Sequence, residues 1–122
     1  MAASSMALKL ACGVLMCMVA YASLAHAASF TCKQMLDTVA PCQPYLENAA
    51  PLTDTCCSRV KFLNNLATNG TTADRQKACK CVKGAVANST DSYLGLAQGL
   101  PGKCGVTAPY PIGRTVNCTS VQ

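Results

Sequence analysis

Cysteine constrains this chain more than any other residue type, because ten of its 122 residues are cysteines. Two of them, Cys12 and Cys17, lie in an apolar run at residues 10–24, which follows a basic start and precedes Ala25-His26-Ala27. The run is shorter than the about 20 residues of a membrane-spanning helix and ends in small residues typical of signal-peptidase cleavage. We therefore expect residues 1–27 to be a signal peptide, with cleavage after Ala28 as the alternative, and residues 28–122 to form one secreted domain.

Eight cysteines remain in the expected domain. A short secreted chain with an even, high number of cysteines is typical of a disulfide scaffold, whereas a zinc site would need Cys-x2-Cys ligand pairs, which the domain lacks. Disulfide geometry disfavours a bond within Cys56-Cys57 or within Cys79-Lys80-Cys81. Each of these four cysteines should therefore tie a different element, and the pairing stays open at this point.

Charge and histidine content exclude several functions. The one histidine, His26, falls in the expected signal peptide, so the domain cannot build a Ser-His-Asp or Cys-His catalytic arrangement. Loss of Lys9 lowers the net charge from +5 to +4, and no run of Lys and Arg marks a nucleic-acid interface. We expect no enzyme activity, no catalytic residue, no metal, no cofactor and no nucleic-acid partner.

Local patterns predict helices and only weak strands. A first helix begins after Thr31, with Gln34 as its reciprocal capping partner, and kinks or ends at Pro41 and Pro44. A second helix begins near Thr53 or Asp54 and continues at helical spacing toward Asn69-Gly70.

A third helix begins at Thr71 or Thr72, and a short fourth helix covers about residues 92–98 and ends at Gly99. From Pro101 onward, Pro or Gly recurs every few residues, which predicts an irregular C-terminal tail.

The cysteine spacing and two pentapeptides resemble those of the plant non-specific lipid-transfer proteins of type 1, over the whole expected domain. Thr71-Thr72-Ala73-Asp74-Arg75 is similar to the first pentapeptide of that family, and Pro109-Tyr110-Pro111-Ile112-Gly113 to the second, with Gly113 in place of the usual Ser. The gap before Cys79 is two residues longer than usual, which we assign to the Asn69-Gly70 turn because insertion in a turn is tolerated.

The resemblance implies an all-α fold: a four-helix, disulfide-stapled bundle with an irregular C-terminal tail that encloses a hydrophobic tunnel. It also implies a disulfide pattern. The implied pairs are Cys32–Cys81, Cys42–Cys56, Cys57–Cys104 and Cys79–Cys118. The related type 2 pattern exchanges the partners of Cys79 and Cys81, but the polar residue between them, Lys80, favours type 1.

The function implied by the resemblance is transport of fatty acids, acyl-CoA, lysophospholipids or phospholipids between membranes or to the cell wall. The protein would be an extracellular monomer that contacts membrane surfaces transiently. Arg75 and Tyr110 would contact the lipid head group. The residues implied to line the tunnel are Met35, Val39, Val60, Leu63, Val82, Leu100, Ala108 and Ile112.

Two other functions fit parts of the sequence. Eight-cysteine seed inhibitors of amylase and protease share the cysteine plan and act through an exposed loop, although the two pentapeptides argue against this class. A membrane-permeabilising defence peptide is compatible with the positive net charge, and such an activity can coexist with lipid transport.

Overall fold

The computed structural model describes residues 30–122, so the expected signal peptide and its cleavage site lie outside the described residues. The described chain is helical and contains no β-strand, which confirms the all-α prediction. Its α-helices are α2 (Cys32–Thr38), α3 (Gln43–Leu46), α4 (Asp54–Asn69), α5 (Thr72–Val86) and α6 (Asp91–Lys103). Two short 3-10 helices, η1 (Ala40–Cys42) and η2 (Cys118–Ser120), complete the secondary structure.

Threonine side chains cap the start of helices α2 and α5 where the sequence predicts them to. The Thr31 hydroxyl accepts a hydrogen bond from the Gln34 amide nitrogen at 3.1 Å, and the Gln34 side chain accepts one from the Thr31 amide at 3.0 Å. Thr71 and Asp74 form the same reciprocal pair at the start of α5, with distances of 3.1 and 3.0 Å. These capping boxes satisfy amide groups that a helix start leaves unpaired.

Proline divides the first expected helix. Helix α2 ends at Thr38, the chain passes Pro41 in η1, and a separate helix α3 begins with Pro44 in its first turn. Proline lacks the N–H that a helix interior needs, but its fixed φ angle suits the first turn of a new helix. The described chain therefore has five α-helices rather than four.

The predicted end of the last helix at Gly99 is wrong, because α6 continues to Lys103. Leu100 is buried after Gly99, and Cys104 at the C-terminal end of α6 is joined to Cys57 of α4. Packing and this covalent tie hold the last turn in spite of the low helix propensity of Gly99 and Pro101.

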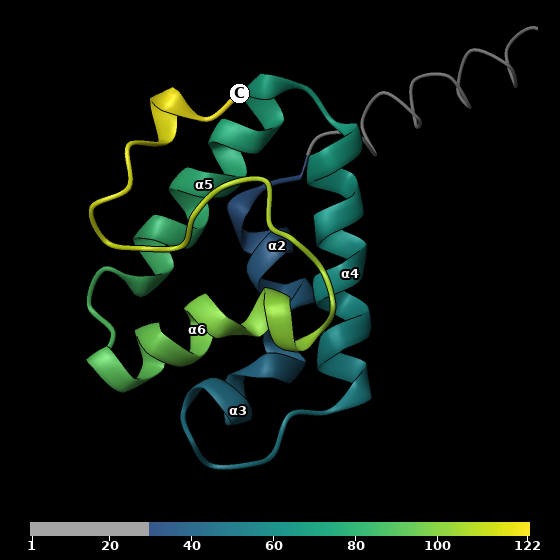
Figure 1. Cartoon of the computed structure of the whole chain (residues 1–122), viewed down its shortest axis with the longest axis vertical. Helices are drawn as coiled ribbons and strands as arrows, with labels where there is room; N and C mark the ends of the chain where they lie inside the picture. The colour runs from purple at the N-terminus through teal and green to yellow at the C-terminus, as the bar shows by residue number, and fades with distance from the viewer. Residues whose placement is uncertain (1–29) are drawn as a thin grey trace, which may run out of the picture. The chain divides into compact units, whose positions relative to one another are not determined.

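The four disulfides connect the helices and the tail in the same pairs that the resemblance implies. Within the described chain, Cys32 joins Cys81, Cys42 joins Cys56, Cys57 joins Cys104 and Cys79 joins Cys118. Helix α3 packs on α6, α4 contacts α2, α5 and α6, and η2 lies against α5. The tail, green-yellow to yellow in Figure 1, runs from the end of α6 back to α5.

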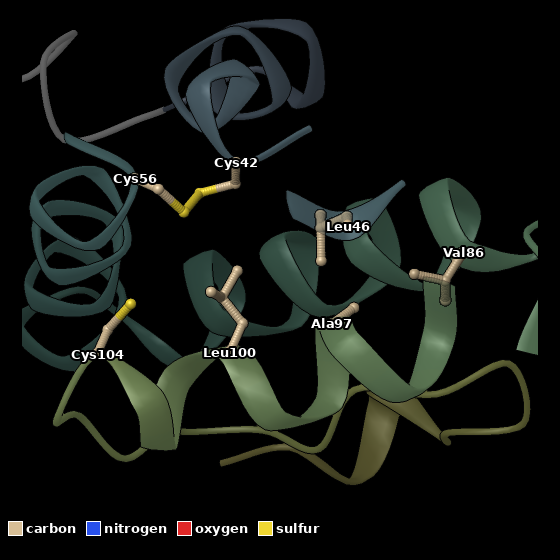
Figure 2. Close-up of a cluster of buried hydrophobic side chains, with 7 residues drawn as sticks. All are labelled: Cys42, Leu46, Cys56, Val86, Ala97, Leu100 and Cys104. Carbon is tan, nitrogen blue, oxygen red and sulfur yellow. A yellow bond between two sulfur atoms is a disulfide. The ribbon is translucent and has the colours of Figure 1, made fainter. Parts of the chain in front are cut away.

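Buried side chains gather in two clusters. The first, which we name the central cluster, consists of Cys42, Leu46, Cys56, Val86, Ala97, Leu100 and Cys104. Figure 2 shows these side chains coming from η1, α3, α4, α5, and α6 and its C-terminal end, with Cys42 and Cys56 joined by a disulfide. The second, the tail cluster, consists of Cys79, Cys118 and Val121, with Tyr110 and Val116 packed against it.

Candidate functional site

A cavity of about 150 Å³ lies between the helices and the tail. Every helix from α2 to α6 contributes to its wall, and the tail provides one more side. The wall residues are Met35, Leu36, Val39, Cys42, Leu46, Val60, Leu63, Asn64, Ala67, Val82, Ala85, Val86, Tyr93, Ala97, Leu100, Pro101, Ala108, Pro109, Tyr110 and Ile112. Asn64, Tyr93 and Tyr110 carry polar groups and the other side chains are apolar, so the wall is suited to an apolar ligand.

The structure brings most of the sequence-derived site residues together. All eight residues implied to line a tunnel lie in the wall, and so does Tyr110. Wall residues that the implied tunnel set lacks include Asn64, Ala85 and Val86. Helical spacing places Ala85 and Val86 on the same apolar stripe of the third helix as Val82, and it would place Asn64, four positions after Val60, on the face of Val60.

The cavity approaches the surface between α2 and α5. Leu36 and Ala85 are the wall residues that are exposed, Leu36 to 40%. Leu36 lies four positions after Cys32, and Ala85 lies four positions after Cys81, the disulfide partner of Cys32. These two wall residues are therefore exposed one helical turn beyond that disulfide.

The tail forms the wall segment with the fewest main-chain bonds. In the described chain, residues 107–116 make no hydrogen bond between two main-chain groups. Side chains of the helices and Arg114 of the segment itself, which bonds to Val86, Ser89 and Asp91, hold it instead. The Gln98 side-chain amide donates to the Ile112 carbonyl at 3.0 Å, and the Lys83 ammonium donates to the Val116 carbonyl at 2.9 Å. The position of residues 107–116 therefore depends on a few side-chain hydrogen bonds.

Arg75 is not among the wall residues, although the first pentapeptide implies a ligand contact. Its Nε donates to the main-chain oxygen of Gln122 at 2.7 Å, and its Nη1 donates to the carbonyls of Ala67 and Gly70 at 3.1 and 2.8 Å. The guanidinium therefore joins the end of the tail to the turn between α4 and α5.

Gly70 makes this turn possible, because a Cβ there would lie 2.9 Å from the Leu66 carbonyl oxygen. Gly113, the departure in the second pentapeptide, is also confined: a Cβ there would lie 3.2 Å from Val116 Cγ2.

Tyr110 is the wall residue with an altered titration. Burial raises the pKa of its phenol from 10.0 to about 12, because a phenolate is poorly solvated there. The structure gives its hydroxyl no hydrogen-bond partner in the described chain. At physiological pH, Tyr110 therefore offers a neutral hydroxyl to whatever enters the cavity.

Residues 30–122 contain no helix long and apolar enough to cross a membrane. In the same region no group of three or more His, Cys, Asp or Glu side chains is placed to hold a metal ion.

Sequence comparison connects the chain to a protein family. The profile of the protease inhibitor/seed storage/LTP family matches residues 32–118. A non-specific lipid-transfer protein of Gossypium hirsutum is 48% identical over 122 residues, which cover 98% of this chain and 99% of the relative.

Solved structures agree with the sequence comparison. Barley non-specific lipid transfer protein 1 in complex with a lysophosphatidylcholine superposes with a TM-score of 0.66 and 30% identity, over 76% of this chain and 100% of the barley chain. Wheat non-specific transfer protein complexed with two phospholipid molecules gives a TM-score of 0.63 and 34% identity, over 75% and 100% of the two chains. The chain therefore belongs to the protease inhibitor/seed storage/LTP family, among its non-specific lipid-transfer proteins.

Proposed function

We propose that this protein is a secreted lipid carrier that holds the acyl chain of a fatty acid, acyl-CoA, lysophospholipid or phospholipid in its cavity. The observation that carries the proposal is the cavity wall, in which five helices and the tail present apolar side chains around one space. The lipids named for the barley and wheat relatives support the same class of cargo.

An apolar wall favours broad cargo selection. Burial of one methylene group away from water stabilises a complex by about 0.8 kcal/mol, and this interaction has no direction. An apolar pocket distinguishes ligands that differ by one methylene by only about 1–3 kcal/mol. Acyl chains of different length should therefore bind to the same cavity, and binding alone requires no covalent chemistry.

The head group of the lipid contacts Tyr110 in this proposal. The Tyr110 hydroxyl lies in the wall without a partner and stays neutral, so it can donate a hydrogen bond to a carboxylate or phosphate oxygen. Arg75 acts on the head group indirectly, since it binds Gln122 at the end of the tail, and Tyr110 lies earlier in the same tail. This assignment replaces the direct Arg75 contact that the family motif implies.

Loading of a long acyl chain requires the wall to move outward. Pockets for small ligands usually measure about 300–1,000 Å³, and this cavity measures about 150 Å³. The tail is the wall segment best able to move, because residues 107–116 depend on side-chain contacts rather than on main-chain bonds of their own.

Cargo exchange proceeds in this proposal by transient contact of a monomer with a membrane surface. Arg59, Lys61, Lys77, Lys80 and Lys103 are exposed and make no ion pair within the described chain. A well-placed cation adds about 1 kcal/mol of attraction to an anionic membrane. These separate charges support brief contact rather than stable anchoring.

The cavity favours a carrier over the two other functions. An inhibitor of amylase or protease needs an exposed loop and gives no reason for an apolar cavity. Membrane permeabilisation remains compatible with the positive charge, and leakage of dye from anionic vesicles would measure it separately from transport.

A displacement assay with a fluorescent fatty acid tests the proposal. We expect Val82→Phe, which places a larger side chain at a half-buried position of the cavity wall, to weaken binding about tenfold. Ala87→Phe is the control, because Ala87 is exposed and is not a wall residue. Equal binding by the native protein and both variants would show that the acyl chain does not occupy this cavity.

A further inference from the structure

The tail is tied covalently at both ends but not in between. Cys104 at its start bonds to Cys57, and Cys118 near its end bonds to Cys79. Between these disulfides, residues 107–116 make no hydrogen bond between two main-chain groups in the described chain. Because the disulfides fix only the two ends, the position of the middle depends on the side-chain bonds that hold it.

Arg114 makes more of these side-chain bonds than any other residue of the described chain. Its Nη2 donates to the Ser89 carbonyl at 2.6 Å, and its Nε donates to the Val86 carbonyl at 3.3 Å. Its Nη1 donates to the Asp91 carboxylate at 2.9 Å. The two helix side chains that hold the same segment contribute one bond each. A guanidinium suits three acceptors, because it carries five donors in a fixed fork.

The acceptors of Arg114 belong to a well-packed part of the molecule. Val86 is the last residue of α5, is buried in the central cluster and lies in the cavity wall. Ser89 lies in the turn between α5 and α6, and Asp91 is the first residue of α6. A cation is favourable at the C-terminal end of a helix, because the last carbonyls carry partial negative charge. Arg114 therefore ties the middle of the tail to the end of α5.

The two carbonyl bonds provide most of this tie. They are partly buried, whereas the bond to Asp91 is exposed. The Asp91 side chain is 97% exposed and the Arg114 side chain 31%. Ion pairs at the surface contribute little, because solvent and salt screen the charges. The hold on the tail should therefore survive loss of the Asp91 charge but not loss of the guanidinium.

We propose that Arg114 is a positioning residue that controls how fast lipid enters and leaves the cavity. This inference rests on the proposed lipid-carrier function. Tyr110 and Ile112, four and two positions before Arg114, are wall residues, so release of Arg114 lets this side of the wall move outward. The cavity of about 150 Å³ must widen whenever a long acyl chain enters or leaves.

This role has a kinetic signature. Loss of the Arg114 bonds should destabilise the tail position equally in the free and the lipid-bound protein, because Arg114 is not a wall residue. The association and dissociation rate constants should then rise by the same factor, while Kd stays nearly constant. Loss of one positive charge would instead slow the entry of an anionic fatty acid. Faster entry therefore cannot be an effect of charge.

Stopped-flow measurement of the binding and release of a fluorescent fatty acid tests the inference. In Arg114→Ala, both rate constants should rise about tenfold, the factor for one hydrogen bond from a charged donor at a partly exposed place. Arg114→Lys keeps the charge but loses the fork, so both should rise only about threefold. Asp91→Asn should change them by less than about twofold. Thr115→Ala is the matched control, because Thr115 is adjacent, exposed and without a hydrogen bond in residues 30–122.

Unchanged rate constants in Arg114→Ala, with the fatty acid still bound, would overturn the inference. Faster release at an unchanged association rate would also overturn it, because that pattern places the effect of Arg114 in the lipid complex alone. If Arg114→Ala does not fold, the rates of Arg114→Lys decide the inference in the same way. Failure of the native protein to bind the fatty acid would instead overturn the carrier function, and this inference with it.

Discussion

The central cluster contributes five of its residues to the cavity wall, whereas the tail cluster reaches the wall only through Tyr110, which packs against it, and different interactions hold the two clusters. In the central cluster, side chains from α3, α5 and α6 pack on one another, and two disulfides, Cys42–Cys56 and Cys57–Cys104, fix the surrounding helices. The tail cluster has one disulfide, Cys79–Cys118, and Val121 as its largest apolar member. Further polar contacts to the tail come from side chains of α5, from Gln98 of α6 and from Arg114 of the tail itself.

This difference assigns the rigid part of the cavity wall to the central cluster and the entry of lipid to the tail. Apolar packing in the central cluster is distributed over many contacts, so no small movement releases it. Apart from the Cys79–Cys118 disulfide and the small tail cluster, the tail is held at a few donor–acceptor pairs. The central cluster should therefore stay packed when the tail moves, while the tail should set how lipid enters and how its head group is held.

The largest expected effect comes from removal of the disulfide in the tail cluster. Replacement of Cys79 and Cys118 by Ala removes a link across 39 residues, which lowers the free energy of unfolding by about 4 kcal/mol in the chain-entropy model. The same change at Cys42 and Cys56, across 14 residues, should cost about 3 kcal/mol. Guanidinium unfolding measures both.

Lipid retention should distinguish the two double variants more clearly than stability does. The variant without Cys79–Cys118 should release a bound fatty acid faster, because its tail has lost the covalent tie. If the variant without Cys42–Cys56 releases lipid just as fast while folded, the proposed division between the clusters is wrong.

Removal of the Arg75 side chain should have the second largest effect. Arg75→Ala deletes three hydrogen bonds to main-chain oxygens, and the one to Gln122 binds the tail. A hydrogen bond from a charged group contributes about 1.5–3 kcal/mol, and partial exposure favours the low end of that range. Thermal unfolding should show this loss of stability. Lys77→Ala is the control, because Lys77 lies on the same helix as Arg75, is exposed and has no hydrogen-bond or ion-pair partner in the described chain.

The ligand dependence of Arg75→Ala sharpens the comparison. Because Arg75 holds the tail and is not a wall residue, the affinities for a fatty acid and for the fatty alcohol of equal length should fall by similar factors. A selective loss of acid binding would show that Arg75 contacts the head group directly.

Tyr110→Phe should affect binding while leaving the fold intact. Only the hydroxyl is lost and the ring still packs on the tail cluster, so fatty-acid affinity should fall about fivefold, or about 1 kcal/mol. Tyr93→Phe is the matched control, since its hydroxyl bonds to Gln43 and should not be available to the ligand. A larger binding loss in Tyr93→Phe than in Tyr110→Phe would show that the head group contacts Tyr93 and not Tyr110.

The smallest effect is a difference in the alkaline titration. Because burial raises the pKa of Tyr110 to about 12, this phenol should be almost un-ionised at pH 10, where an ordinary tyrosine is half ionised. Subtraction of the Tyr110→Phe absorbance at 295 nm from that of the native protein isolates Tyr110. A step near pH 10 in that difference would show that the residue is exposed to solvent.

The sign of the linked stability change follows from the same pKa. The folded state favours the protonated phenol, so this stabilising contribution is complete below pH 10 and is lost as the pH rises through about 12. Tyr110→Phe should lack this loss.

Local chemistry made much of the fold predictable. Capping threonines such as Thr31 and Thr71 bond to residues three positions away, so a short window of sequence contains both partners. The end of α6 was not predictable in this way, because its last turn depends on the bond from Cys104 to Cys57, 47 residues earlier. Family resemblance supplied the disulfide pairs and eight of the wall residues, which local pattern alone left open.

The sequence by itself determined an all-α, disulfide-rich domain, because helix caps and cysteine spacing are local or countable features. Only the tertiary structure decided what the polar residues at the cavity do. Arg75 bonds to Gln122, 47 residues away, and so holds the tail rather than lining the cavity. Asn64 and Asn65 are the same residue type in adjacent positions, yet one lies in the wall and the other faces solvent. Helix rotation and long-range packing set these roles, and neither is encoded by residue type at a single position.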